Sequence, residues 1–371
     1  MGSETATKLK RLRAEEALEL VRVPLPAESN NSTVSHRYMS TRSAWNAGSL
    51  VAEAGHDIKA AQSGVFGGTV YAQAPLAASR SLEDGNEPES GVANPTAKFG
   101  IHSIQGVFTL PGKADRPFVY DVTPISSGRS FSTRLVTARQ AKEPSANPKG
   151  PFPSSDAAQP MADVCFSCLT TFKRSRSSPA DEQSTQSAQQ RYASILSTRE
   201  PDQWPVCPLV EVDDVRHVLS SKGHANFPAL DMYRVDMTSY NKDKPITERR
   251  ELIYYRPYKP IALNDANTHI VCHAFEADRN GITMLVNHLG YGHNLGKAAS
   301  LSYSFYVHVN AEDAVMDGTG WWLQEASWPR ASAGRCMMEC RIWSPEGKHV
   351  ATGYQDGILL PEMTEEEKSK L

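Results

Sequence analysis

A polar side chain, Gln355, stands inside the last apolar segment of the chain, residues 349–360. A buried amide that lacks hydrogen-bond partners costs about 1–3 kcal/mol, so its surroundings in the fold must supply partners. Gln355 is therefore a candidate site residue. The alternative is a strand amide that pairs only with neighbouring backbone.

Two other patterns do not carry the chemistry that they suggest. Cys165 and Cys168 form a CxxC pair, but it lies in an apolar, strand-like segment with no second pair, so we expect these cysteines to be core or edge residues. Residues 290–298 are glycine-rich like a phosphate loop, but the glycine spacing is wrong and Ala298 stands where a metal-binding hydroxyl is needed. The sequence thus predicts no metal and no organic cofactor.

The composition narrows the function classes. The 371 residues carry a formal net charge of −3, which gives no overall basic footprint for nucleic acid. No apolar run approaches the roughly 18 residues that cross a bilayer, so we expect a soluble protein without a membrane span. Six cysteines without a secretory N-terminus favour a reducing compartment and free thiols.

The elements that position Gln355 occur in an order that the chain repeats. A predicted helix precedes a set of strand-like runs in each half: residues 66–79 before 99–110, 118–125, 130–139 and 162–172, and residues 269–286 before 299–309, 320–327, 334–343 and 349–360. A helix followed by antiparallel strands predicts a two-layer α+β unit with the sheet wrapped around the helix. Two copies predict a fused pseudo-dimer with one continuous sheet.

Turn and loop signals divide the chain further. Pro345 and Gly347 mark a hairpin turn between the last two strands, and Pro75 predicts a kink or an early end of the first helix. Residues 82–96 and 142–160 are predicted to be surface insertions.

The predicted domains are residues 15–173 and residues 205–362. Residues 174–204, rich in Ser, Gln, Ala and Asp, are predicted to be a flexible linker. Residues 363–371 form a charged tail that ends in Ser369-Lys370-Leu371, the tripeptide that a peroxisomal import receptor reads. The sequence therefore predicts a protein of the peroxisomal matrix.

Four segments resemble the type II acyl-CoA thioesterases, the double-hotdog family. The closing strand, Val-Ala-Thr-Gly-Tyr-Gln-Asp-Gly-Ile from position 350, is similar to the closing strand of that family. The other three segments, residues 65–74, 102–112 and 117–140, fall in the family's order. The resemblance implies a double-hotdog fold and hydrolysis of a fatty or other acyl-CoA to a free acid and CoA.

The resemblance also implies the site. Gln355 would help to hold the hydrolytic water, and Ser327 lies where the family has a hydroxyl residue. Ser302 occupies the position assigned to the family's aspartate. Because a serine hydroxyl is not a base near neutral pH, Asp278 on the second central helix is a candidate replacement base.

Several alternatives stay open. Asp278 could instead be a packing residue that is hydrogen-bonded across the pseudo-dimer, and His273 and His308 are other conceivable bases. Gly67 and Gly68 would let backbone N–H groups at a helix start approach a thioester oxygen, or they serve close packing alone. If hydrolysis was lost with the aspartate, the chain would be an acyl-CoA-binding or transfer protein of a specialised, secondary-metabolite pathway. The oligomeric state is left open, with a homo-oligomer as one option.

Overall fold

The computed structural model describes residues 11–26, 33–44, 64–84, 98–208, 211–213, 229–279, 281–292 and 294–362. The strands of the first half are β1 (Leu20–Arg22), β2 (His36–Ser40), β3 (Phe99–Phe108), β4 (Phe118–Ser127), β5 (Phe131–Gln140) and β6 (Phe166–Arg174). Those of the second half are β7 (Leu230–Arg234), β8 (Glu251–Pro257), β9 (Leu295–Val307), β10 (Trp322–Ser332), β11 (Arg335–Trp343) and β12 (His349–Pro361).

Three longer helices accompany these strands: α3 (Gly67–Asp84), α8 (Ala266–Arg279) and α9 (Gly281–Leu289). The shorter helices are α1 (Ala14–Ala17), α4 (Ala188–Arg191), α5 (Ala193–Leu196) and α7 (Thr238–Asn241). Single 3-10 turns cover Ser154–Ala158, Pro201–Gln203, Ile246–Glu248 and Ala311–Ala314. The helix predicted at residues 269–286 is therefore two helices, α8 and α9.

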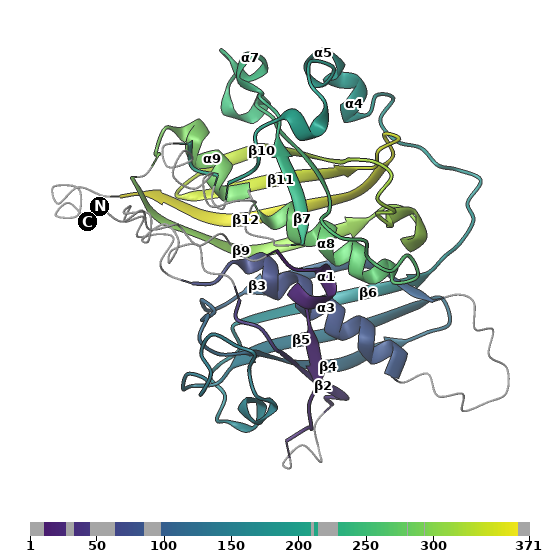
Figure 1. Cartoon of the computed structure of the whole chain (residues 1–371), viewed down its shortest axis with the longest axis vertical. Coiled ribbons are helices and arrows are strands. Elements are labelled where there is room, and N and C mark those ends of the chain that lie inside the picture. The colour runs from purple at the N-terminus through teal and green to yellow at the C-terminus, as the bar shows by residue number, and fades with distance from the viewer. Residues whose placement is uncertain are drawn as a thin grey trace, which may run out of the picture.

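Within the described residues the strands form one antiparallel sheet of twelve, in the order β1-β2-β4-β5-β6-β3-β9-β12-β11-β10-β8-β7 (Figure 1). The order on one side of the β3–β9 junction mirrors the order on the other. Each half contributes two strands, a central helical segment and then four strands, so the predicted repeat is confirmed. The halves join where β3 pairs with β9, with Gly106 opposite Tyr303.

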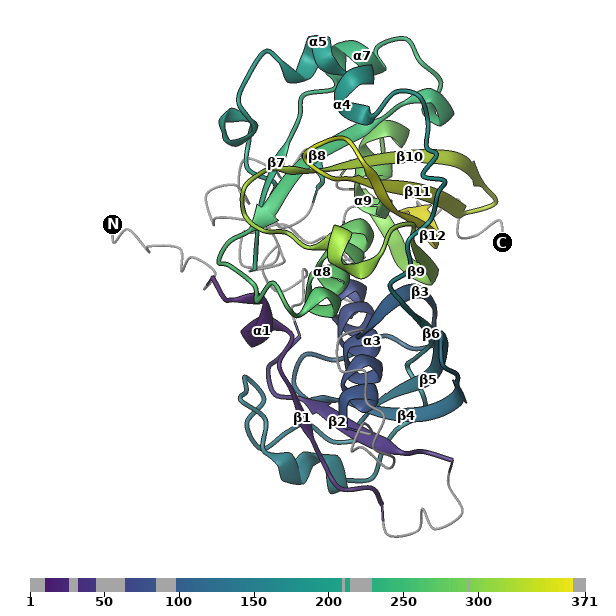
Figure 2. The ribbon, with the colours of Figure 1, turned by 90° about the vertical axis from the view of Figure 1, so that its right-hand side faces the viewer.

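The central helices α3 and α8 pack against each other on the inner side of the sheet (Figure 2). The small side chains of α3 allow close contact with its neighbours. Four of its alanines are fully buried: Ala72, Ala74, Ala77 and Ala78. At the other end, Phe66 just before α3 stacks on Phe275 of α8, with ring centroids 5.9 Å apart. The core is thus continuous across the pseudo-dimer.

The predicted early end of the first helix at Pro75 is wrong. Helix α3 continues through Pro75 to Asp84. A proline inside a helix removes one backbone hydrogen bond. Here the surrounding turns are buried, with Ala74 and Ala77 inaccessible to solvent and Leu76 5% exposed, and tertiary packing of this kind outweighs a local preference.

Within residues 174–204, predicted to be a flexible linker, residues 187–204 pack against the second half, whereas residues 175–186 are exposed. Tyr192, Leu196 and Trp204 are buried against Tyr254, Trp343 and neighbouring apolar side chains. The Gln183 amide adds two bonds of 2.9 Å, donating to the Gly347 carbonyl and accepting from the His349 N–H. A few widely spaced apolar residues anchor the segment, and its polar composition concealed them.

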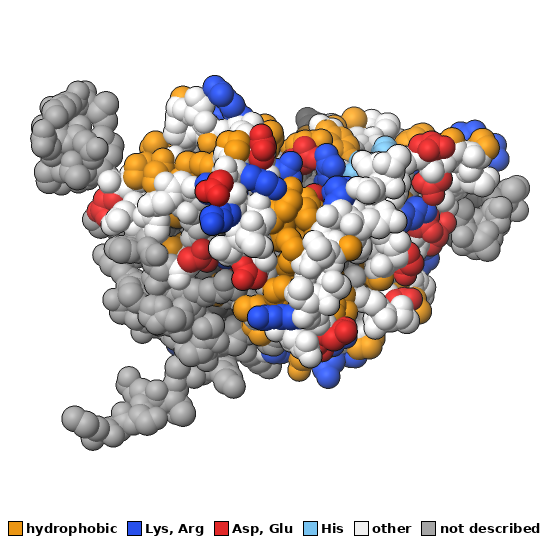
Figure 3. All heavy atoms as spheres, turned by 90° about the horizontal axis from the view of Figure 1, so that it is seen from above, with side chains coloured by type: hydrophobic (Ala, Val, Ile, Leu, Met, Phe, Trp, Pro, Cys, Tyr) orange, Lys and Arg blue, Asp and Glu red, His pale blue; other side chains and the backbone are white. Residues whose placement is uncertain are grey.

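The cysteines, the helices and the surface charge of the described residues follow the composition. All six cysteines are free and buried, so the CxxC pair belongs to the core as predicted. No described helix is long and apolar enough to cross a membrane. Seen from above, the surface shows acidic and basic side chains interspersed (Figure 3). Of the insertion predicted at residues 82–96, residues 82–84 belong to the end of α3, and the remainder, like the tail at 363–371, lies outside the described residues.

Asn267 at the start of α8 links the two halves and provides a test of their joint. Its amide donates to Ser79 Oγ (2.7 Å) and the Phe99 carbonyl (3.0 Å), and its Oδ1 accepts the Ile101 N–H (2.8 Å). Asn267→Ala should lower the free energy of unfolding by about 2–4 kcal/mol, because each buried group left unpaired costs about 1–3 kcal/mol. Urea denaturation followed by tryptophan fluorescence measures the loss. The exposed Asn264→Ala should change stability by less than about 0.5 kcal/mol, and equal losses in both variants would contradict this account.

Candidate active site

Asp278 lies in the last turn of α8, where the second half of the molecule meets the start of α3. Its side chain is 3% exposed, and it accepts a hydrogen bond from the backbone N–H of Gly68. A Cβ atom at Gly68 would stand 3.3 Å from Asp278 Oδ2, and one at Gly67 would stand 3.5 Å from it. The N-terminus of α3, with its partial positive charge, therefore faces this carboxylate closely because both positions are glycine.

Gln355 and Ser300 complete the group. The Gln355 amide donates to Asp278 Oδ1 at 2.7 Å and to Ser300 Oγ at 2.7 Å, and the Ser300 hydroxyl in turn donates to Asp278. Asp278 comes from α8, Ser300 from β9 and Gln355 from β12. A carboxylate, a hydroxyl and an amide thus lie close together. These three groups are able to hold and deprotonate a water molecule.

A β-bulge turns Ser300 toward this point. Gln355 lies opposite Tyr303 on β9, and both side chains are buried on the helix side. The register then slips: Asp356 pairs with Ser302, but the next residue, Gly357, pairs with Ser300, which leaves Leu301 without a directly opposite partner. An extra residue reverses the alternation of side chains beyond it, so Ser300 faces the helices although Ser302 does not.

Burial sets the protonation of the carboxyl group. Removal from water raises the pKa of Asp278 to about 7, and the bonds from the Gly68 N–H and the Ser300 hydroxyl oppose that rise. A carboxyl group that titrates near neutral pH exchanges protons readily at working pH, which suits a general base. Ser300, Phe66 and Phe108 beside the group are only partly buried, although Asp278 and Gln355 themselves are buried.

Ser302 and Ser327, predicted to be site residues, do not lie with this group. Ser302 faces the outer side of the sheet, where it lines a shallow hollow of about 360 Å³ with Ser304 and Val107. Ser327 is opposite Glu339, and its chain neighbours Ala326 and Trp328 are the residues buried beneath the helices. Strand alternation therefore puts both predicted hydroxyls on the wrong face.

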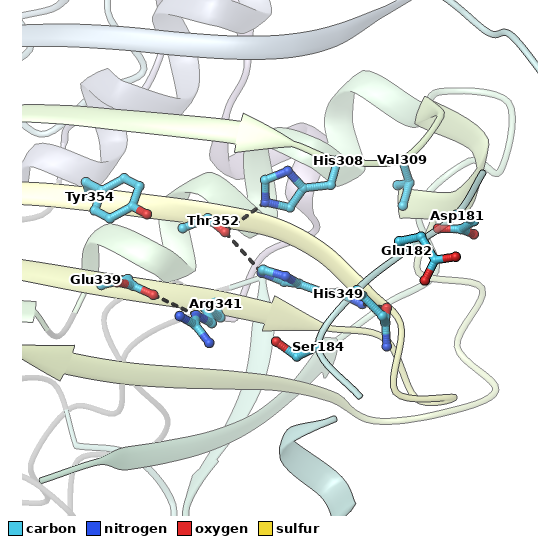
Figure 4. Close-up of a pocket in the computed structure, with 11 residues that line it drawn as sticks. Asp181, Glu182, Ser184, His308, Val309, Glu339, Arg341, His349, Thr352 and Tyr354 are labelled. Atoms are coloured by element: carbon cyan, nitrogen blue, oxygen red, sulfur yellow. Dashed lines mark hydrogen bonds and ion pairs between the residues drawn. The ribbon is translucent and has the colours of Figure 1, made fainter. Parts of the chain in front are cut away.

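The two histidines considered as bases are also elsewhere. His273 is buried between the Tyr255 hydroxyl (2.7 Å) and the Ala314 carbonyl (2.9 Å), and burial lowers its pKa to about 3. His308 lies on the outer face in a hollow of about 380 Å³, where its Nε2 meets Thr352 Oγ1 at 2.8 Å (Figure 4). Neither histidine takes part in the group around Asp278.

The structure thus brings together four predicted residues, Gln355, Asp278, Gly67 and Gly68, and adds Ser300. The sequence offered a faint signal for Ser300, since the run Ala-Ala-Ser-Leu-Ser-Tyr-Ser has serines at alternate positions. Alternation alone could not say which serine faces inward, because the bulge that decides it depends on pairing with β12. No group of three or more possible metal ligands exists among the described residues.

Comparison with known proteins identifies the family of the chain. A model of the acyl-CoA thioesterase N-terminal domain matches residues 56–151, and a model of the acyl-CoA thioesterase C-terminal domain matches residues 228–359. Together they cover more than half of the chain. The second match contains Asp278, Ser300 and Gln355.

Individual relatives agree at low identity. Acyl-coenzyme A thioesterase 8 of Homo sapiens is 22% identical over 304 residues, which is 80% of each chain. Acyl-CoA thioesterase II of Mycobacterium marinum has 20% identity and a TM-score of 0.58, over 94% of this chain and 98% of that one. A hotdog-fold protein of unknown function from Alicyclobacillus acidocaldarius has 14% identity and a TM-score of 0.54 over the same shares. These likenesses confirm the predicted double hotdog, and the two domain matches show that the chain belongs to the acyl-CoA thioesterase family.

Proposed function

We propose that this protein hydrolyses an acyl-CoA thioester with a water molecule activated by Asp278. The observation that carries the proposal is the buried carboxylate with a pKa of about 7, bonded to Gln355 and Ser300 beneath the N-terminus of α3. In the reaction, Asp278 accepts a proton as the water oxygen attacks the thioester carbon. The bond from carbon to sulfur then breaks, and the CoA thiolate takes up the proton.

Each neighbour has a part in this proposal. The Gln355 amide hydrogens fix the orientation of Asp278 and Ser300, and the Ser300 oxygen supplies a further contact for the water. The N-terminus of α3 lies beside the same point and stabilises the negative charge that develops on the thioester oxygen, because backbone N–H groups and the helix dipole favour an anion there. Gly67 and Gly68 let the substrate approach that helix end without a Cβ atom in the way.

The non-hydrolytic alternative followed from reading Ser302 as a replacement for a catalytic aspartate. Since Ser302 lies on the outer face and Asp278 stands beside Gln355, no observation favours a binder or a transfer protein over a hydrolase. Release of free thiol from a panel of acyl-CoA substrates distinguishes these functions directly. Binding without thiol release from any member of the panel would overturn the proposed hydrolysis.

Removal of the base provides the sharpest test of the site. Asp278→Asn should lower kcat by about 10²–10⁴, the usual contribution of a general base, as measured by thiol release. Ser300→Ala and Gln355→Ala should lower kcat to a smaller extent, because each removes one contact that holds the carboxylate or the water. The matched control is Ser302→Ala, two residues along the same strand, which should retain wild-type turnover. An active Asp278→Asn variant, or a loss in Ser302→Ala as large as in Ser300→Ala, would refute the assignment.

The raised pKa of Asp278 predicts the pH dependence. Only the ionised carboxylate can accept the proton, so kcat/KM should rise with pH through an apparent pKa of about 7 and level off above it. Initial rates between pH 5 and 9 with one acyl-CoA measure the curve. A profile that is already flat at pH 5 would mean that Asp278 is not the base.

We also propose that the protein enters peroxisomes through Ser369-Lys370-Leu371. The tripeptide matches the terminal import signal, and the charged residues before it are of the kind that stay exposed to a receptor. A fluorescent protein fused to the N-terminus should be seen in puncta that coincide with a peroxisomal marker. Deletion of Leu371 should leave the fusion in the cytosol, and unchanged puncta after the deletion would contradict the proposal.

A further inference from the structure

Gln355 lies against Gly281, the first residue of α9. Helix α8 ends at Arg279 and α9 begins at Gly281. A Cβ atom at Gly281 would stand 2.1 Å from Gln355 Oε1 and 2.4 Å from Met338 Sδ, so the Gly281 backbone lies directly beside the amide. The Gly281 backbone therefore limits where the Gln355 amide can lie.

Trp328 holds the Gly281 backbone in place. Its indole N–H donates to the Gly281 carbonyl at 2.8 Å, and its ring is fully buried. On the other side, the ring of His288 in α9 packs against the indole with centroids 4.9 Å apart, and His288 Nε2 lies 3.0 Å from Glu251 Oε1. A rigid aromatic side chain thus ties the start of α9 to strand β10.

In the described part of the chain, the oxygen of the Gln355 amide has no hydrogen bond that would orient it. Its Nε2 serves both Asp278 and Ser300, whereas Oε1 is buried with no hydrogen-bond partner among the described residues. An oxygen without a partner does not resist rotation, so the contact with the Gly281 backbone keeps the amide nitrogen directed at Asp278. Any displacement of Gly281 would let the amide turn away.

We propose that Trp328 is a positioning residue for hydrolysis, which holds Gln355 toward Asp278 through the Gly281 carbonyl without touching the substrate. This inference rests on the proposed function of the Asp278 group. It predicts a defect confined to the chemical step, because the fully buried indole acts only on the position of the amide. The expected signature is a lower kcat with a nearly unchanged KM.

The charge state of Asp278 provides a readout that general destabilisation would not give. The Gln355 N–H bond favours the ionised carboxylate, so weakening it should raise the pKa of Asp278. Other titratable groups near Asp278 are Tyr71 of α3 and Tyr303 of β9, and burial raises the pKa of both well above the usual value, so both stay neutral near pH 7. Glu276, on the same helix, has its pKa raised by burial to about 7 and contacts Arg279.

The test compares wild type, Trp328→Phe, Gln355→Ala and the double variant, by thiol release between pH 5 and 9. Trp328→Phe keeps a ring but removes the donor; it should lower kcat roughly tenfold and move the acidic limb of kcat/KM upward by roughly one pH unit. Gln355→Ala should shift the limb in the same direction. If Trp328 acts through Gln355, the double variant should be no worse than Gln355→Ala alone.

Two further variants keep the test decisive. Trp322→Phe is the matched control, since Trp322 is buried on the same strand but packs on His273, and it should leave the acidic limb in place. Gly281→Ala pushes on the amide directly and should reproduce the upward shift even if Trp328→Phe folds poorly. The inference would be overturned if the losses in kcat were additive in the double variant. It would also be overturned if Gln355→Ala shifted the acidic limb of the kcat/KM profile while Trp328→Phe and Gly281→Ala both left it in place. A wild type without turnover would instead overturn the proposed function.

Discussion

The burial of one carboxylate constrains much of this molecule. An ionised carboxyl group in a dry interior is costly, and it persists only where hydrogen bonds offset the loss of water. Asp278 obtains those bonds from three elements: the Gly68 N–H of α3, the Ser300 hydroxyl of β9 and the Gln355 amide of β12. Because α3 belongs to the other half of the chain, the group exists only when both halves are docked.

The docking explains several features that have no obvious purpose in either half alone. The start of α3 carries two glycines, which permit its backbone to reach Asp278. Asn267, the second residue of α8, bonds to Ser79 and to the backbone of β3. The sheet continues across the junction without an edge, so the two hotdog units share both a core and a hydrogen-bond ladder. A rigid junction is what a site assembled from two halves requires.

The end of α8 is held by a second buried polar cluster. Arg279, the residue after Asp278, has no exposed surface, and it pairs with Glu276 at 3.1 Å and approaches Glu211 at 4.0 Å. Arg234 bridges Glu211 and Glu251, each at 3.1 Å. Such buried ion pairs add little net stability, but loss of one partner leaves an uncompensated charge. The cluster therefore fixes where α8 ends, and with it the position of Asp278.

Some parts of the fold and the site were within reach of the sequence. The repeated order of one helical segment and four strands depends on local periodicity, and the structure confirms it together with the hairpin between β11 and β12. The short flanking strands β1, β2, β7 and β8 were missed, because three to seven residues carry too little pattern to separate a strand from a loop. The sequence left open a kink or an early end of α3 at Pro75, and the early end is wrong because packing and not propensity sustains the helix to Asp84.

The sequence by itself determined the residue types and the repeat: an amide in the last strand, a carboxylate on the second central helix and two glycines at the start of the first. Only the tertiary structure decided which residues meet. A strand's side chains alternate, so the single bulged residue Leu301 brings Ser300 to the helix side of the sheet, while Ser302 stays on the outer face. That bulge is a property of pairing between β9 and β12, which lie some fifty residues apart in the chain. Contacts over such separations follow from the folded sheet and leave no local trace in the sequence.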